Sequence, residues 1–374
     1  MNPISRPQLK IPFYAKTALV FIAAFAFVFV LYIGQHIIVP ILYATIVAIL
    51  LNPFVNFLEN RKMNRIVAIS LAVILVFFIT ACFIYFLYFQ VSMFADTYPQ
   101  LKAKTEILIN QLVLWTSEHF NFSVAEINLW IANTEAVMFR DSGQMLGRTL
   151  ISITNTLVVL FLLPVYLFMI LYYKPLLLEF IRQLFDVVHR TKVLEVLGRS
   201  KGIIQSYLVG LLIEILIMSI LNSAGLLILG IDYAIILGIT GALLNVIPYI
   251  GGIVGTALPM MIAFITKDSA TYPLMVLAVY LIIQLIDNNF IVPMVVGSKV
   301  KLNALVSIIV VIIGGAIWGI SGMFLSIPLL AILKVVFDNV ESLRPWGFLL
   351  GNIVPATANF AILEPIKNKI KKFV

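Results

Sequence analysis

The sequence predicts an all-α integral membrane protein with about six full transmembrane helices and two re-entrant helical hairpins. Three observations support this. Of the 374 residues, 62% are hydrophobic and only 11% are charged, whereas soluble domains carry about 25% charged residues. Long uncharged runs recur, each near the roughly 20 residues that cross a bilayer as a helix. Two later apolar runs contain several glycines and prolines, which disfavour a continuous helix.

The basic residues predict which side of the membrane each loop faces. The net charge is +8, and a basic soluble protein would be considered as a nucleic-acid binder. Here, however, Lys and Arg gather at the ends of apolar runs, as they do in cytoplasmic loops of membrane proteins. No nucleic-acid partner is therefore expected. The basic N-terminus, the loop 59–65 and the Lys-rich segment 366–373 predict that both termini are cytoplasmic.

The chain divides into five predicted segments. Residues 1–90 hold three N-terminal spans that act as a scaffold. Residues 91–148 are the longest water-facing stretch and predict a small helical extracytoplasmic domain. Residues 149–202 hold the fourth span and an amphipathic helix on the cytoplasmic surface, for which a solvated loop is the alternative. Residues 203–337 form the expected transport core, and residues 338–374 a basic cytoplasmic tail.

The two broken segments of the core resemble each other. Each has an aromatic residue ten positions before a proline, Tyr249 before Pro259 and Trp318 before Pro328, with small residues between. Paired segments of this kind are the best sequence indication of a transporter site. If both fold back as hairpins that enter from opposite faces, the basic loop 297–301 faces the cytoplasm, as its charge predicts.

Glycines and prolines are expected to shape and gate these hairpins, although close packing of helix arms would explain the glycines without any ligand. The residues concerned are Pro248, Tyr249, Gly251, Gly252, Gly255, Pro259, Pro293, Gly314, Gly315, Gly319, Gly322 and Pro328.

Polar residues at membrane depth are few in the core and form the candidate site. A charged side chain there costs at least about 2.5–3.5 kcal/mol, so each one is a functional hypothesis. Gln284, Asp287 and Asn288 share one helix face, and a carboxylate with amide oxygens suits Na⁺ or a polar organic solute. The alternative is that Asp287 only caps or bridges at the membrane edge.

Glu214 lies inside a long apolar run and is a second candidate. A carboxyl group in apolar surroundings favours its neutral form, so Glu214 could carry a coupling proton; a hydrogen bond between helices is the alternative. The full expected binding site is Asp287, Asn288, Asn289, Gln284, Glu214 and Asn245. No metal centre and no cofactor are expected.

Three stretches carry a resemblance to a known family. They are LNVIPYIGG at 244–252, DNNFIVP at 287–293 followed by Gly297, and GGAIWGISG at 314–322 with Pro328. Together they resemble signatures of the AI-2E family of transporters, and the resemblance covers nearly the whole chain. It implies a bacterial inner-membrane protein, linked in some members to export of the quorum signal autoinducer-2 and in others to sodium or proton antiport. It also implies homo-oligomers, pentamers among them.

The residues predict a secondary active transporter that exports a small polar solute, driven by a proton or sodium gradient, and the resemblance implies autoinducer-2 as an example of that solute. The expected partners are membrane lipids, the solute, H⁺ or Na⁺, and further copies of the chain. A Na⁺(Li⁺)/H⁺ antiporter is the alternative, and an oligomeric channel or a scaffold would be of another class.

An enzyme is not expected. Residues 319–322 match the GxSG motif of rhomboid proteases, but that chemistry needs a histidine base nearby. The three histidines, His36, His119 and His189, all precede the later spans.

Overall fold

The computed structural model describes residues 12–120, 123–125, 128–129, 142–247, 250–267, 269, 271–297 and 302–352. The regular structure of this part of the chain is helical, apart from one isolated bridge between Leu302 and Gly351. Seven helices in it are long and apolar enough to cross a membrane. The prediction of an all-α integral membrane protein is confirmed.

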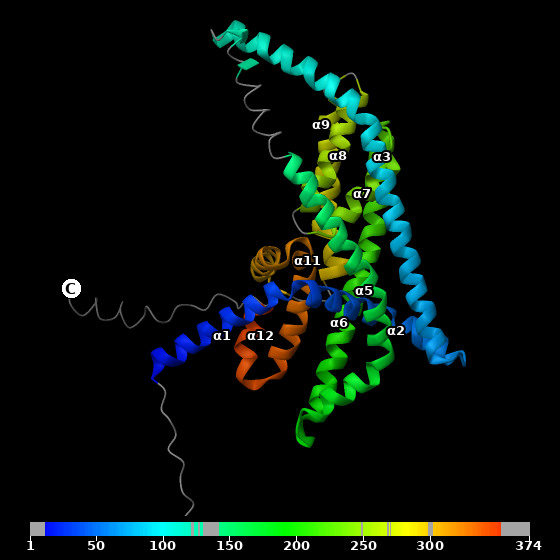
Figure 1. Ribbon diagram of the computed structural model, residues 1–374, viewed down its shortest axis with the longest axis vertical. Coiled ribbons are helices and arrows are strands. Elements are labelled where there is room, and N and C mark those ends of the chain that lie inside the picture. The colour runs from blue at the N-terminus through cyan, green and yellow to red at the C-terminus, as the bar shows by residue number, and fades with distance from the viewer. Residues whose placement is uncertain are drawn as a thin grey trace, which may run out of the picture.

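Four long helices form the N-terminal part: α1 (Phe13–Ile33), α2 (Gln35–Asn60), α3 (Arg65–Phe120) and α5 (Ser142–Gln183). A buried apolar cluster that contains Ala44, Ile69 and Leu167 joins α2, α3 and α5. α1 extends away from this cluster (Figure 1) and buries none of its residues. A helix that is apolar all round and unburied suits a lipid environment.

α3 continues well beyond the span that the sequence predicts. Its 56 residues correspond to a length of about 84 Å at 1.5 Å per residue, against a hydrocarbon thickness of about 30 Å. Residues 91–120 of the predicted extracytoplasmic domain therefore extend the third span without a break. Residues 130–141 lie outside the described part, so the domain itself stays a prediction.

The predicted amphipathic helix on the cytoplasmic surface is not a separate element. α5 continues to Gln183, a turn follows at 184–186, and α6 (Val187–Ile228) then begins. The apolar residues between Phe180 and Val188 would share one face of a continuous amphipathic helix. In the structure they lie at the junction of α5 and α6 instead. The helical structure is interrupted here only at this turn, and α5 continues through Pro175.

The first broken segment forms a helical hairpin, called hairpin 1, from α7 (Ala234–Asn245) and α8 (Ile250–Thr266). With 12 and 17 residues, neither arm has the roughly 20 that cross a membrane. The arms approach at glycines: a Cβ atom on Gly255 would lie 3.1 Å from the Cα atom of Gly241. Pro248 and Tyr249, at the predicted tip, lie outside the described residues.

The second broken segment, α11 (Ala304–Asn339), folds back on itself and is called hairpin 2. The helix breaks at Trp318 and Gly319, where Gly319 has a φ of 60° that favours glycine. The arms are antiparallel, since Ser326 contacts Val310 and, one turn nearer the break, Gly322 faces Gly314. Counting α11 as a hairpin leaves six candidate spans and two hairpins, as the sequence predicts. Their entry from opposite membrane faces stays a prediction.

Gly322→Ala is expected to destabilise hairpin 2, whereas Gly315→Ala is not. A Cβ atom on Gly322 would overlap the backbone carbonyl of Gly314, which can move away only if the arms open. On Gly315 it would meet only the flexible side chain of Met323. Overpacking of the first kind costs about 1–3 kcal/mol. Thermal unfolding in detergent checks this, and equal melting temperatures for the two variants would contradict it.

Both hairpin tips lie against one buried cluster centred on α6. Val246, after α7, and Trp318, at the tip of hairpin 2, pack against this cluster, and the Trp318 indole also donates to the Leu31 carbonyl of α1 at 2.9 Å. From there α8 and α9 (Thr271–Ile286) extend towards one end of the molecule and α12 (Arg344–Leu350) lies towards the other (Figure 1). The buried members of the cluster are Ile46, Ile204, Tyr207, Leu208, Leu211, Leu325 and Ala331.

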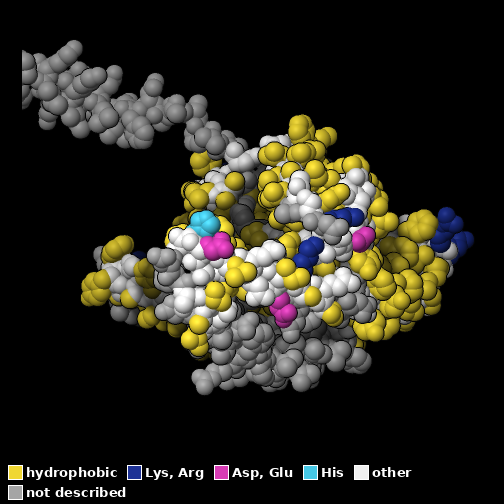
Figure 2. Space-filling model, turned by 90° about the horizontal axis from the view of Figure 1, so that it is seen from above, with side chains coloured by type: hydrophobic (Ala, Val, Ile, Leu, Met, Phe, Trp, Pro, Cys, Tyr) yellow, Lys and Arg dark blue, Asp and Glu magenta, His cyan; other side chains and the backbone are white. Residues whose placement is uncertain are grey.

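The surface agrees with a lipid environment. Figure 2 looks along the long axis and shows hydrophobic side chains over much of this end, with charged ones scattered among them. Large apolar side chains such as Leu274 and Leu281 are exposed, and a lipid solvent removes the need to bury them.

Candidate functional site

The helix that carries most of the predicted site is α9 (Thr271–Ile286), which continues into two π-helical stretches, η1 (Asp287–Ile291) and η2 (Pro293–Gly297). Pro293 does not end this helical run, because wider turns accommodate the proline, which has no N–H to donate. The Val292 N–H bonds to the Asp287 carbonyl, five residues back. Such π-helical interruptions frequently occur at functional sites.

Two buried carboxylates share one amide. Asp287, at the start of η1, is 1% exposed, and Glu214 of α6 is 7% exposed. Asn245 is the last residue of α7, and its Nδ2 atom donates to Asp287 Oδ2 at 3.0 Å and to Glu214 Oε1 at 3.4 Å. An amide nitrogen has two hydrogens, so both bonds form at once. Asn245 thus ties hairpin 1 to α6 and η1.

Gln284 extends this network along α9. Its Nε2 atom lies 3.4 Å from Asp287 Oδ2 and 3.4 Å from Asn288 Oδ1. Asn288 is exposed, so it lies at the edge of the site. Asn289 is also exposed, and its amide donates to the Leu285 carbonyl of its own helix at 2.8 Å. The structure therefore brings five of the six predicted residues together and leaves Asn289 outside.

The site carries negative charge without a basic partner. Among the described residues, neither carboxylate forms a salt bridge, and Asp287 Oδ1 is buried with no hydrogen-bond partner there. A buried charge that is not paired is costly, so such a group binds a cation or takes up a proton. The arrangement is suited to reversible binding of H⁺ or a small cation.

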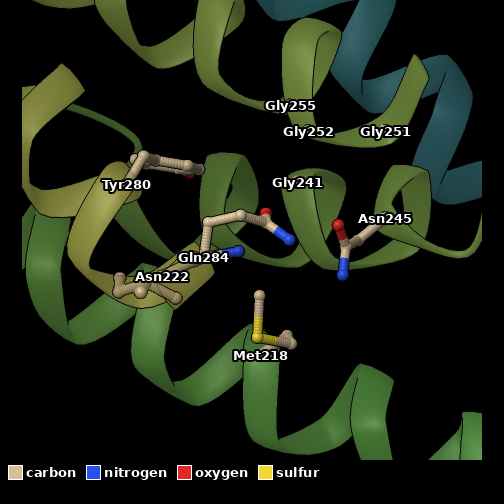
Figure 3. Close-up of a pocket in the computed structure, with 10 residues that line it drawn as sticks. Met218, Asn222, Gly241, Asn245, Gly251, Gly252, Gly255, Tyr280 and Gln284 are labelled. Carbon is tan, nitrogen blue, oxygen red and sulfur yellow. The ribbon is translucent and has the colours of Figure 1, made fainter. Parts of the chain in front are cut away.

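A narrow polar pocket adjoins the carboxylates, between α6, hairpin 1 and α9 (Figure 3). Asn245 and Gln284 belong to both the pocket and the carboxylate network. The free space is about that of one water molecule, so a larger solute requires hairpin 1 to move. The lining residues are Met218, Asn222, Gly241, Asn245, Gly251, Gly252, Gly255, Tyr280, Ile283 and Gln284.

Two polar atoms of the pocket lack a hydrogen-bond partner among the described residues. The Oδ1 atom of Asn222 and the hydroxyl of Tyr280 are buried and have no hydrogen-bond partner in the described part of the chain. Both side chains lie beside Gly241: a Cβ atom there would be 3.2 Å from the Tyr280 hydroxyl and 3.3 Å from Asn222 Nδ2. Buried polar groups are normally hydrogen-bonded, so these two atoms can bind a polar ligand.

Sequence reasoning missed Met218, Asn222 and Tyr280. Helical spacing could have found them: Met218 and Asn222 follow Glu214 by four and eight residues, and Tyr280 precedes Gln284 by four. Residues four apart lie on one helix face, so the polar residues of α6 and α9 mark the two faces that meet at the site.

The predicted hairpin residues divide between two places. Gly251, Gly252 and Gly255 of hairpin 1 line the pocket, whereas Gly314, Gly315, Gly319, Gly322 and Pro328 of hairpin 2 do not. Pro259 is buried within α8, and Pro293 is exposed on η2. Gly314, Gly315 and Gly322 lie where the two arms of hairpin 2 meet, and Gly319 lies at the turn between them.

Comparison with known proteins identifies the family of this chain. The chain matches the family model described as AI-2E family transporter over residues 19–342. It is 28% identical to YueF of Bacillus subtilis (strain 168) over 313 residues, which cover 81% of this chain and 84% of that protein. It is 24% identical to the AI-2 transport protein TqsA of Escherichia coli (strain K12) over 321 residues, or 86% and 91% of the two chains. The chain therefore belongs to the AI-2E family of transporters, as its sequence signatures predict, and is a multi-pass membrane transport protein.

Proposed function

We propose that the protein is a secondary active transporter that exports a small polar solute across the bacterial inner membrane, with both termini in the cytoplasm. The observation that carries this proposal is the pair of buried carboxylates, Glu214 and Asp287, joined by Asn245 beside a polar pocket. The carboxylates supply an ion site, and the pocket supplies a solute site. Because Asn245 belongs to both, occupation of one site can alter the other.

The donors around the carboxylates support H⁺ as the coupling ion. Asn245 and Gln284 both present N–H groups to Asp287, and an N–H group cannot ligate Na⁺, which needs oxygen ligands. A proton needs only a carboxylate oxygen, and Asp287 Oδ1 has no partner among the described residues. Binding of Na⁺ would require the side-chain amides of Asn245 and Gln284 to rotate so that their oxygen atoms, rather than their N–H groups, face Asp287.

The pocket supports an uncharged polar solute. Its unused groups, Asn222 Oδ1 and the Tyr280 hydroxyl, are neutral hydrogen-bonding groups, and glycine backbone forms much of the remaining wall. One relative of this chain is named for transport of AI-2. Autoinducer-2 is therefore the first solute to test.

Hairpin 1 is the proposed moving element. The base of its second arm is held on α3, because Lys104 Nζ donates to the Lys267 carbonyl at 2.6 Å. Its tip is held by the bonds of Asn245 to the carboxylates. Protonation weakens a carboxylate as an acceptor, since hydrogen bonds to charged groups are about twice as strong as neutral ones. Proton binding would thus release the tip and open the pocket.

The carboxylate pair also favours a second candidate, a Na⁺(Li⁺)/H⁺ antiporter. Competing H⁺ and metal ions at one carboxylate pair would give exchange without an organic solute. In both cases the proposal includes assembly with further copies of the chain, which mass measurement of the detergent-solubilised protein would test.

Flux measurements in proteoliposomes test these alternatives. We expect saturable flux of autoinducer-2 that responds to an imposed pH gradient and is unchanged by a Na⁺ gradient. Proton flux that requires Na⁺ or Li⁺ and no solute would support the antiporter. Flux that does not saturate and only follows the solute gradient would contradict a carrier and indicate a channel. Liposomes without protein are the control.

A further inference from the structure

A second polar cluster lies apart from the transport site, among the N-terminal helices and α6. At its centre, Lys174 of α5 donates to Asn52 Oδ1 of α2 at 2.5 Å. Arg65, at the start of α3, and Lys201 of α6 are close enough to Lys174 for their charges to repel it. Four helices therefore bring basic or polar side chains to one place, which is called the Lys174 cluster.

The Lys174 cluster has an excess of positive charge. Glu59 is its carboxylate, with Oε1 3.7 Å from Arg65 Nε, and it offsets only part of the repulsion that Lys201 and Arg65 exert on Lys174. Like charges in partly buried positions are poorly screened by salt. The three cations are therefore held together at a cost that a bound anion would remove.

The role of Arg65 is accounted for by the fold. Pro175 has no N–H to donate to the Leu171 carbonyl four residues earlier. The Arg65 guanidinium donates to that carbonyl at 3.0 Å, and to the Tyr172 carbonyl at 3.1 Å. Arg65 thus completes the hydrogen bonding of α5, and this structural task leaves the other two cations unexplained.

Lys174 and Asn52 have unused donors. An ammonium group has three N–H donors, and the bond to Asn52 takes one of them. Asn52 is 5% exposed, and its Nδ2 atom is buried without a hydrogen-bond partner in the described residues. The amide oxygen of Asn52 accepts from Lys174, but its amide nitrogen has no acceptor. A buried polar group normally has a hydrogen-bond partner.

We propose that the Lys174 cluster binds the phosphate group of an anionic phospholipid. Lys174 donates its remaining N–H groups to the phosphate oxygens, Asn52 Oδ1 holds Lys174 in place, and Lys201 adds attraction. Apolar side chains next to Lys174 on α5 are exposed, among them Leu176 at 63% and Phe180 at 59%, so acyl chains have a surface to follow. Basic pockets between membrane helices on the cytoplasmic side bind anionic headgroups in this way.

The test uses the full chain in nanodiscs of phosphatidylcholine, with or without phosphatidylglycerol. Native mass spectrometry counts the phosphatidylglycerol retained. Lys174→Gln removes the charge, while its amide still reaches Asn52; we expect about fivefold less retained lipid, from roughly 1 kcal/mol per basic residue. The control is Arg182→Gln, on the same helix, where Arg182 is exposed and pairs with Glu179 at 2.7 Å. It should retain as much lipid as the unchanged protein.

Each of the remaining outcomes also supports or overturns the proposal. Equal retention by Lys174→Gln and the unchanged protein would overturn the proposal, and so would an equal loss in Arg182→Gln, which would indicate general surface attraction. If Lys174→Gln does not fold, Lys201→Gln replaces it, with lower retention expected at an unchanged melting temperature. In a separate experiment, inorganic phosphate is added to the protein in phosphatidylcholine nanodiscs. If it raises the melting temperature as much as phosphatidylglycerol does, the proposal that the anion is a lipid headgroup is overturned.

Discussion

Asp287→Asn is expected to reduce gradient-driven transport by roughly 10- to 100-fold while the protein still folds. The substitution keeps the size of the side chain but takes away the group that can bind a proton or cation. Folding should persist because replacing a buried, unpaired charge by a neutral group removes a desolvation cost. Weakening a hydrogen bond to a charged group costs about 1.5–3 kcal/mol, which corresponds to roughly a 10- to 100-fold loss of flux. Solute flux into proteoliposomes under an imposed pH gradient measures this loss.

The matched control is Asp232→Asn, which changes an exposed carboxyl group before α7 and should transport normally. Full, gradient-dependent flux by Asp287→Asn would contradict a role for the charge. Glu214→Gln then separates the two carboxylates. If it transports without dependence on pH, Glu214 holds the coupling proton; if the coupling is unchanged, Glu214 serves only as a hydrogen-bond partner of Asn245.

Gly251→Ala is expected to reduce transport by about tenfold or more, whereas Gly252→Ala changes it less than about twofold. A Cβ atom on Gly251 would overlap the Leu244 carbonyl and the backbone of Asn245. The arms of hairpin 1 must then separate, and Asn245 moves away from the carboxylates. On Gly252 the added atom would lie 3.7 Å from Gln284 Oε1, an ordinary contact.

The two glycines are neighbours in one turn of α8, so the change in helix propensity is the same for both and cancels in the comparison. Flux and melting temperature should be measured together. We expect Gly251→Ala to lower both, because overpacking against backbone costs about 1–3 kcal/mol. Similar flux in the two variants would show that the closed geometry at Asn245 is not needed for transport.

Much of the fold was predictable because lipid imposes local rules. Each of the features that predict the fold can be recognised from neighbouring residues alone: long uncharged runs, basic residues at span ends, and clustered Gly and Pro residues. The same holds for the site within a single helix: the spacing of Glu214, Met218 and Asn222 defines one face of α6. A local rule does not decide the structure where it allows two outcomes, as at Pro293, where a proline can end a helix or be accommodated by a π-helical turn.

By itself, the sequence determined that this is a multi-pass helical membrane protein with two broken segments and a few polar residues at membrane depth. The tertiary structure decided which of those residues meet. Asn245 lies 31 residues from Glu214 and 42 from Asp287, and no local pattern says that its amide joins them. Nor does any pattern select hairpin 1 over hairpin 2 as the wall of the pocket. Those contacts depend on how closely the glycine-lined arms pack, and such packing is a property of surfaces from distant parts of the chain.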